Sequence, residues 1–362
     1  MTSEQPLPVR IADARLVTAA GAGIAPALAA ATTATGAAQR HDTLTATAPD
    51  GGQRPVYYAP ALAPALDEGR AHHLLDTLID ETGDTPERAD GVWCLVPKAP
   101  LPDGMDTEPA TLVEHAAERL GGPAEQAPTT TGALPVLAQL RRALAAGGID
   151  SIWLIAVQSL IDGDTIRALA DDRPLKSQGS EGLVPSEAAV ALRLTAGVAT
   201  AGEPVIRGLA SREAAGSAAN RTSRHPLADS IRAACAEAGR EVTPVADCFS
   251  DNSGDTDAQL EWWRTTQQLW PAELPEDQRR AVELGLMAKP PLASPAPRLI
   301  HPPGAIGHSS VAGALAQLAL AHRHWDWQQR CAARDLAPPP GANLITEHPL
   351  AAHRHAAVLA TN

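Results

Sequence analysis

The chain of 362 residues carries a formal net charge of −13, is 44% hydrophobic and contains only 3% aromatic residues. This acidic balance argues against binding to nucleic acid or to anionic membranes, because both select basic patches. The four cysteines lack the spacing of a zinc motif, and we expect no metal or cofactor. No apolar run is long enough to cross a bilayer, and residues 1–10 are polar. We therefore expect a cytoplasmic protein with no membrane partner.

The first half of the sequence alternates strand and helix patterns. The continuous apolar run over residues 151–157 is typical of a parallel strand that is covered on both faces. Leucines at regular spacing predict a helix over residues 134–146, whereas the small polar residues of 32–53 predict a loop. The other expected strands are 9–18, 55–59 and 91–97, and the other expected helices are 25–31, 69–81 and 111–119.

The second half repeats this alternation, which predicts an α/β architecture for the whole chain. The proline-rich stretch over residues 271–297 is expected to cross the surface without regular structure. Strands are expected over 187–194, 204–210, 245–250, 343–346 and 355–360, and helices over 225–238, 258–269 and 309–322.

Two segments of the chain resemble each other. The tetrapeptide Leu-Ala-Gln-Leu occurs at residues 137–140 and again at 315–318, and aligning the two copies puts Thr130 opposite His308. This echo is either chance in a chain rich in alanine and leucine, or the mark of a duplicated fold. In a duplicated fold, two central helices would point their N-termini, which attract anions, at one site.

Four stretches in the right order resemble the β-ketoacyl synthases of the thiolase superfamily. The most specific are Gly-Leu-Val-Pro-Ser-Glu-Ala-Ala-Val-Ala-Leu-Arg-Leu at 182–194 and Gly-Ala-Ile-Gly-His-Ser-Ser-Val-Ala-Gly-Ala-Leu at 304–315; the others are 9–21 and 149–162. The resemblance implies a thiolase-like five-layer αβαβα sandwich of two pseudo-repeated halves, divided here into residues 1–165 and 166–362. It also implies a dimer formed through an edge strand of the first half.

The active-site residues that the resemblance implies are mostly replaced. The nucleophilic cysteine at a helix N-terminus becomes Thr130, and a hydroxyl is a poor nucleophile without a strong base. The first catalytic histidine becomes Asp251, whose charge would repel a developing enolate. The second histidine survives as His308, either as a catalytic remnant or as a residue held by packing. The oxyanion loop becomes the glycine-free stretch from Asn343 to Pro349.

Two further groups of residues are open to a functional interpretation. The histidines near the C-terminus, with Cys331 among them, could bind a metal, but their spacing favours a solvated histidine-rich surface. The tryptophans of the second half either fill the core or mark a protein-binding surface. The histidines are His322, His324, His348, His353 and His355, and the tryptophans are Trp262, Trp263, Trp270, Trp325 and Trp327.

Two classes of function follow from this resemblance. The first is a non-catalytic ketosynthase-like partner or adaptor: the silent subunit of a heterodimer, or an accessory chaperone of a type VI secretion effector. Its partners would be another thiolase-fold protein in a homo- or heterodimer, a secretion effector or an acyl carrier protein. The alternative is an acyltransferase or thioesterase-type enzyme with altered chemistry that uses Thr130 and His308.

Overall fold

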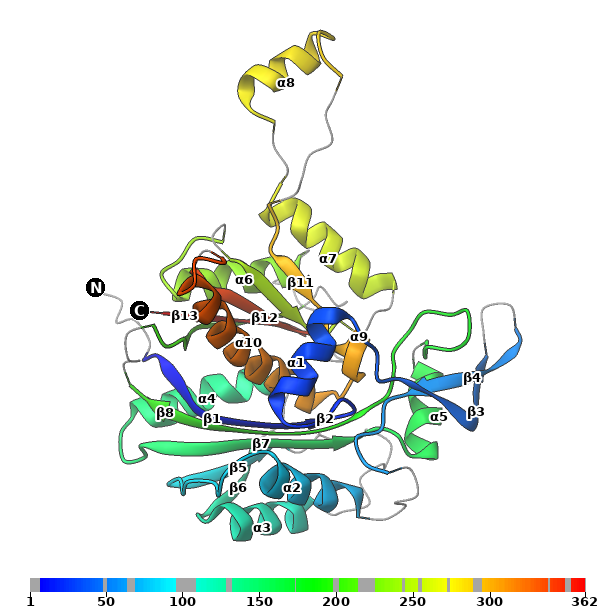
Figure 1. The fold of residues 1–362 in the computed structure, drawn as a ribbon, viewed down its shortest axis with the longest axis vertical. Coiled ribbons are helices and arrows are strands. Elements are labelled where there is room, and N and C mark those ends of the chain that lie inside the picture. Colours follow the sequence, from blue (N-terminus) through cyan, green and yellow to red (C-terminus); the bar gives the residue numbers. More distant parts are fainter. Residues whose placement is uncertain are drawn as a thin grey trace.

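The computed structural model describes most of the chain, and the strands and helices alternate through it (Figure 1). The described residues are 7–47, 51–63, 69–95, 109–127, 132–172, 174–197, 202–213, 225–242, 245–252, 256–271, 274–288, 295–337, 339–348 and 353–361. The elements up to residue 196 are β1 (Val9–Thr18), β2 (Gly21–Ala22), α1 (Ile24–Thr33), β3 (Gln39–Thr47), β4 (Gln53–Tyr58), α2 (Arg70–Glu81), β5 (Gly91–Leu95), α3 (Pro109–Leu120), β6 (Ala124–Ala127), α4 (Ala133–Ala145), β7 (Ser151–Ser159), α5 (Gly163–Asp172) and β8 (Glu187–Ala196). The later elements are β9 (Val205–Glu213), α6 (Pro226–Glu237), β10 (Asp247–Ser250), α7 (Thr256–Leu269), α8 (Glu276–Glu283), β11 (Arg298–Ile300), α9 (Pro302–Ile306), α10 (Val311–Ala332), β12 (Asn343–Glu347) and β13 (His353–Ala360).

The described sheet has eleven strands: two sets of five with the same topology, and β2, which pairs with β1. The first set runs β1-β8-β7-β5-β6 and the second runs β9-β13-β12-β10-β11. In each set the first three strands pair antiparallel and the last three pair parallel. The two sets meet where β1 pairs with β9 through two residue pairs, Val9 with Ile206 and Arg10 with Val205.

This repeat favours a division of the chain later than residue 165. Because β8 pairs with β1 and β7, it belongs to the first set although it begins at Glu187. We propose that the two halves divide between β8 and β9 instead. Helix α5 lies between β7 and β8 in the sequence, so both flanking strands belong to one set.

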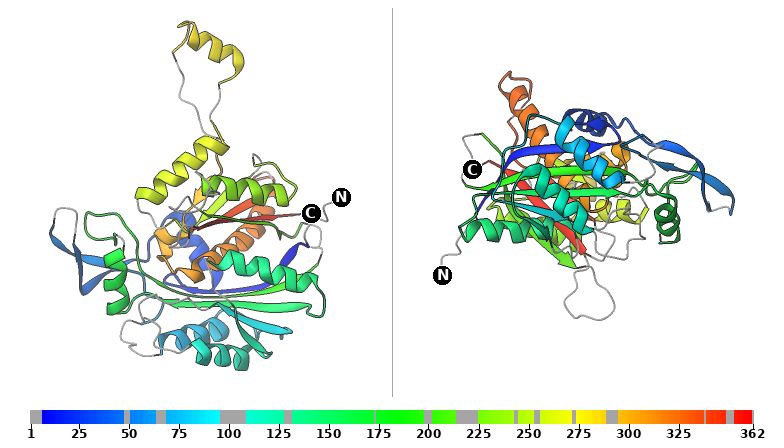
Figure 2. Two further views of the ribbon diagram at one scale, coloured as in Figure 1. Left: turned by 180° about the vertical axis from the view of Figure 1, so that it is seen from behind. Right: turned by 90° about the horizontal axis from the view of Figure 1, so that it is seen from below.

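Helices cover both faces of the strands in five layers (Figures 1 and 2). Helices α2 and α3 pack with β5, β7 and β8 around Leu74, Leu112 and Trp153 on one outer side. Helices α6 and α7 cover β10, β12 and β13 on the other outer side, around Ile231 and Trp270. Helices α4 and α10 lie between the two sets of strands.

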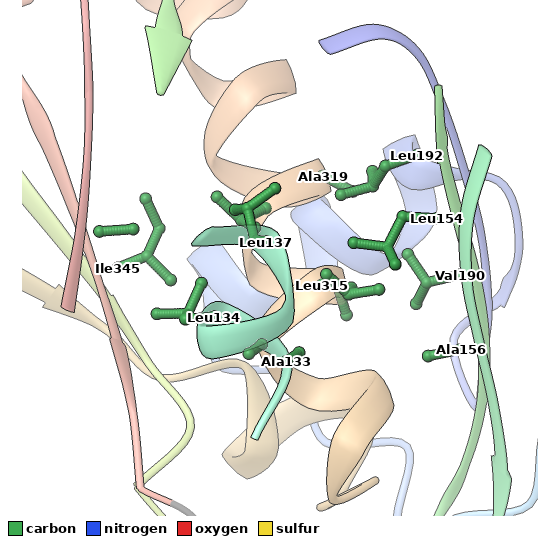
Figure 3. Packing of buried hydrophobic residues seen from close by; sticks show 14 of the residues in the cluster. Ala133, Leu134, Leu137, Leu154, Ala156, Val190, Leu192, Leu315, Ala319 and Ile345 are labelled. Carbon is green, nitrogen blue, oxygen red and sulfur yellow. The ribbon is translucent and has the colours of Figure 1, made fainter. Parts of the chain in front are cut away.

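The central layer forms the largest apolar cluster of the described residues. Figure 3 shows α4 and α10 packed between Ile345 of β12 on one side and Leu154 and Leu192 of β7 and β8 on the other. Each Leu-Ala-Gln-Leu tetrapeptide begins at the fifth residue of its helix, Leu137 in α4 and Leu315 in α10. The sequence echo therefore corresponds to two equivalent helices of the repeat.

Several elements differ from the sequence-based expectation. The stretch 32–53, expected as a loop, contains β3 and the start of β4, which pair as a two-stranded antiparallel hairpin. The proline-rich stretch 271–297 contains α8, which stands away from the rest of the molecule (Figure 1). Among the described residues, none of the helices combines the length and the apolar character needed to cross a membrane.

Candidate functional site

The carboxyl group of Glu347 closes the N-terminus of α4. Glu347 is the last residue of β12 and is only 2% exposed. Its Oε1 accepts a hydrogen bond from the backbone N–H of Ala133 at 2.6 Å, and its Oε2 accepts one from that of Leu134 at 2.9 Å. The first N–H groups of a helix have no partner within the helix and attract anions. Glu347 therefore occupies the position that an external anion would take.

Gly132, the N-cap residue of α4, leaves the space that this carboxyl group fills. Its backbone has φ of 145°, a region that side chains rarely allow. A Cβ atom at this position would lie 2.6 Å from Oε1 of Glu347. The glycine and the glutamate thus depend on each other for this arrangement.

The protonation of Glu347 is shifted toward neutrality. Burial raises the pKa of its carboxyl group to about 8, the negative charge of Asp251 adds to the rise, and the two backbone hydrogen bonds act in the opposite direction. At neutral pH the side chain is therefore mostly a neutral acid. A group with this pKa exchanges its proton within the physiological range.

Asp251 follows β10 and pairs with His348, which follows Glu347. Its Oδ1 accepts the backbone N–H of His348 at 2.7 Å and lies 2.8 Å from Nδ1 of the same residue. Both side chains are buried. Nε2 of His348 makes no hydrogen bond to any described residue, and because Nδ1 is held by Asp251, it is the only ring nitrogen left to react or bind.

Gln317 of α10 forms hydrogen bonds with the carboxyl ends of β10 and β12. With its amide oriented to satisfy its neighbours, it donates to the carbonyl oxygens of Thr346 at 3.0 Å and Phe249 at 3.1 Å, and it accepts the N–H of Asp251 at 2.6 Å. Gln317 is buried and belongs to the second Leu-Ala-Gln-Leu tetrapeptide. The glutamine of the repeated tetrapeptide therefore holds the backbone around Asp251 and Thr346.

His308 lies three residues before the start of α10 and is 5% exposed. Its backbone N–H donates to the carbonyl oxygen of Val184 at 2.8 Å, and its carbonyl oxygen accepts the N–H of Ser186 at 3.1 Å. A Cβ atom on Gly313 would lie 3.9 Å from Oγ of Ser309 and 4.0 Å from Cβ of Asp251. Ser309, which follows His308, and Asp251 thus both lie near the first turn of α10.

The residues expected from the sequence are only partly brought together. Thr130 lies outside the described residues. Asp251 lies beside Glu347 and His348, whereas Asn343 lies at the opposite end of β12, where its Nδ2 contacts the carbonyl oxygen of Ala321 at 3.4 Å. On this strand Glu347, and not Asn343, lies beside Asp251 and the N-terminus of α4, so we take Glu347 as the candidate site residue. Sequence reasoning missed it, although polar residues at the carboxyl end of a buried strand often form a site.

Burial also keeps three of the cysteines from acting as nucleophiles. Burial raises the pKa of the Cys94 thiol to about 12 and that of Cys235 to about 11, and it raises the pKa of Cys248 further still. A thiol is reactive only as its thiolate. None of these three cysteines presents a thiolate near neutral pH.

The prediction of a solvated histidine-rich surface near the C-terminus is wrong for three of its members. His324, His348 and His355 are 2%, 8% and 0% exposed. His324 lies 3.0 Å from Asp247 and His355 lies 2.6 Å from Ser211. Buried imidazoles are tolerated here because each has such a polar neighbour. The described residues contain no group of three or more metal-binding side chains.

Some tryptophans of the second half fill the core, and others lie on the surface. Trp270 and Trp325 are 1% and 0% exposed and fill the core. Trp263 and Trp327 are 58% and 55% exposed. The second pair is therefore available to a binding partner or ligand.

Comparison with known proteins places the fold. No family model matches the chain, and no curated protein sequence matches it. Solved structures match over nearly its whole length at low sequence identity. One is a chain of a complex between a type II polyketide-synthase acyl-carrier protein and its ketosynthase, with TM-score 0.71, 12% identity and coverage of 99% of this chain and 100% of that chain.

Two other matches come from ketosynthase and chain length factor complexes. The ishigamide ketosynthase/chain length factor has TM-score 0.66, 13% identity and coverage of 99% of this chain and 100% of that chain. The ketosynthase ApeO in complex with its chain length factor ApeC from Xenorhabdus doucetiae has TM-score 0.63, 12% identity and full coverage of both chains. The chain therefore adopts the thiolase-like fold of the ketosynthases and chain length factors, a five-layer αβαβα sandwich.

Proposed function

We propose that this chain is the non-catalytic member of a pair of thiolase-fold proteins, in the role that a chain length factor has beside a ketosynthase. The observation that carries the proposal is the carboxyl group of Glu347 at the N-terminus of α4. In the family that the sequence resembles, a nucleophile at this helix terminus uses the free N–H groups. Here those of Ala133 and Leu134 are already bonded.

The charges around this helix terminus also oppose condensation chemistry. Stabilising an enolate or a tetrahedral oxyanion requires donors aimed at the developing charge. In the resemblance described above, Asp251 takes the place of the first catalytic histidine, and a carboxylate there accepts hydrogen bonds rather than donating them. The thiols of Cys94, Cys235 and Cys248 are buried, so they do not replace the missing nucleophile.

The edge strand β6 is the surface through which we propose that the partner binds. Among the described residues, β6 pairs with β5 on one side only. Glu125 and Gln126 of this strand are exposed. An unpaired edge offers backbone groups to a strand of a second chain.

The test is co-expression of the chain with the thiolase-fold proteins that its neighbouring genes encode, followed by native mass spectrometry. We expect a stable dimer with such a protein, and no covalent adduct after incubation with acyl-CoA or an acylated carrier protein. Recovery with a secretion effector instead would replace this proposal by the effector-chaperone role.

Two variants make the test specific. Glu125→Lys combined with Gln126→Lys should dissociate the dimer, whereas Glu276→Lys combined with Gln278→Lys, the same change on α8, should leave it intact. Loss of the dimer in the α8 variant alone would move the interface to that helix. A covalent acyl adduct that disappears in Thr130→Ala would overturn the proposal and favour the acyltransferase or thioesterase-type enzyme.

A further inference from the structure

A hollow of about 400 Å³ lies between α1 and α10, on the outside of the central layer. One wall is the face of α1 that carries Ala25, Leu28, Ala29 and Thr32. These positions follow the spacing i, i+3, i+4 and i+7, so they form a single stripe on the helix. The two alanines of this stripe, Ala25 and Ala29, add little bulk on this side of the hollow.

The opposite wall comes from the second half of α10 and repeats the same spacing. Arg323, Asp326, Trp327 and Arg330 follow i, i+3, i+4 and i+7, and Arg298 of β11 completes the wall. Long charged and aromatic side chains therefore face a stripe of shorter, uncharged ones. Figure 1 shows the two helices next to each other.

The wall on α10 is positively charged in a strongly acidic protein. Three arginines line the hollow with one acid, Asp326, which pairs with Arg323 at 3.4 Å. Arg330 is exposed and makes no ion pair with any described residue. Counting Asp247, which pairs with Arg298, the three arginines exceed the acids around the hollow by one charge, whereas the whole chain has a net charge of −13.

A buried carboxylate holds Arg298 in position. Asp247 is 3% exposed, and its Oδ1 accepts Nε of Arg298 at 2.7 Å. Its Oδ2 lies 3.0 Å from Nε2 of His324 and accepts Nε2 of Gln328 at 2.5 Å. Arg298 is held by Asp247 through its Nε, yet its side chain is well exposed and lines the hollow. A cation that is already ordered loses little side-chain entropy when it binds an anion.

The ring of Trp327 is held by a neighbour that also contacts Asp247. It stacks on the buried ring of His324, with ring centroids 5.4 Å apart and an interplanar angle of 23°. Trp327 is nevertheless 55% exposed. A fixed and exposed indole offers a flat apolar surface to a second aromatic ring.

We propose that this hollow binds a small aromatic carboxylate, with its ring against Trp327 and its carboxylate between Arg298 and Arg330. Arginine is suited to this role because its planar guanidinium pairs with carboxylate oxygens. The volume is that of a small-molecule site. The site is separate from Glu347 and Asp251, so it does not depend on the function proposed above.

The test is isothermal titration of the full chain with three probes: 2-naphthoate, the matched neutral 2-naphthamide and the non-aromatic decanoate. We expect one naphthoate per chain, bound about tenfold more tightly than the amide, because the amide lacks the charge-assisted hydrogen bonds. Decanoate should bind more weakly than naphthoate. Equal binding of naphthoate and the amide, tighter binding of decanoate, or no saturable binding of naphthoate would overturn the proposal.

Variants on the two walls locate the site. Ala29→Phe should abolish binding because it fills the hollow from α1, and Arg330→Gln should weaken it about tenfold from α10. Trp327→Leu should remove the preference for naphthoate over decanoate. The matched controls are Trp263→Leu and Arg264→Gln, which change the same residue types at exposed positions of α7. If the α7 variants weaken binding as much as the α10 variants, the assignment to this hollow is wrong.

Discussion

At the scale of single residues, Glu347 combines two opposed demands. A helix N-terminus stabilises the charged form of a carboxyl group, whereas burial and the neighbouring Asp251 stabilise the neutral form. Burial dominates, because the pKa is raised to about 8. The residue therefore links the stability of the protein to pH.

Replacement of Glu347 by glutamine should change the pH dependence of stability. Between about pH 4.5 and pH 8 the folded wild type keeps a proton that the unfolded chain has lost. The free energy of unfolding of the wild type should therefore fall across this window, by on the order of a few kcal/mol relative to Glu347→Gln, and level off above it. Urea denaturation of both proteins at pH 5, 6, 7 and 8 measures this.

The matched control is Glu237→Gln at the end of α6. Glu237 accepts the N–H of Leu209 at 2.6 Å and pairs with Arg141 at 2.5 Å, so an arginine compensates its charge. This variant should alter stability by a similar amount at pH 5 and pH 8. A wild-type stability that rises from pH 5 to pH 8 relative to Glu347→Gln would contradict the assigned protonation.

The sequence could predict part of this site and not the rest. The Ile-Gly-His segment predicts that His308 precedes a central helix, and His308 does precede α10. Asp251, which the resemblance aligns with the first catalytic histidine, lies close to Glu347. Glu347 itself was hidden, because its importance depends on a contact with residues 133 and 134 more than 200 positions earlier. No local pattern reports such a contact.

At the scale of elements, α10 has two parts with different tasks. From Ala312 to Ala321 nearly all of its side chains are buried between the two sets of strands. Beyond that point one face is exposed and carries the arginines of the hollow. One helix of 22 residues thus serves as a core element and as a binding surface.

Truncation of the buried part should be costly. Leu315 is 0% exposed and packs in the central layer of Figure 3. Leu315→Ala should lower the free energy of unfolding by about 2–5 kcal/mol, through lost burial and the cavity left behind. The control Leu336→Ala, at a residue that is 72% exposed, should change it by less than about 0.5 kcal/mol. Chemical denaturation of both variants checks this; equal losses would contradict the packing.

Elements with a strong apolar period were predicted, and those without one were missed. The buried strand β7 was expected over 151–157 and extends from Ser151 to Ser159. The sequence predicts a loop where the hairpin strand β3 lies, because the residues of β3 are mostly polar and exposed and carry no strict alternation. Helix α8 was hidden among prolines and has no buried residue among those described. Such elements exist without the apolar face that makes a pattern legible.

At the scale of the whole molecule, the arm that carries α8 is set apart from the core. Figure 1 shows it standing beyond α7. Leu284 and Leu286, next to α8, are 64% and 77% exposed. The fold therefore receives little stabilisation from the arm.

Replacing residues 276–286 by a short Gly-Ser linker should leave the melting temperature within about 2 °C of the wild type, because exposed segments contribute few stabilising contacts. The contrasting variant is Trp270→Ala, just before the arm, at a residue that is 1% exposed. It should lose about 3–5 kcal/mol. Differential scanning calorimetry distinguishes the two; a large loss on removing the arm would show that it packs against the body.

The pairing of β1 with β8 affects how the protein can be synthesised. The residues that face each other in these two strands are between 170 and 187 positions apart in the chain. At ribosomal rates, β1 waits roughly 10 to 40 seconds for its partner to emerge. During that time a strand destined for the middle of the sheet exposes its edges and its apolar face. Folding during translation is thus delayed to the second half of the chain, and chaperones that bind exposed strands have their main opportunity before Ala196 leaves the ribosome.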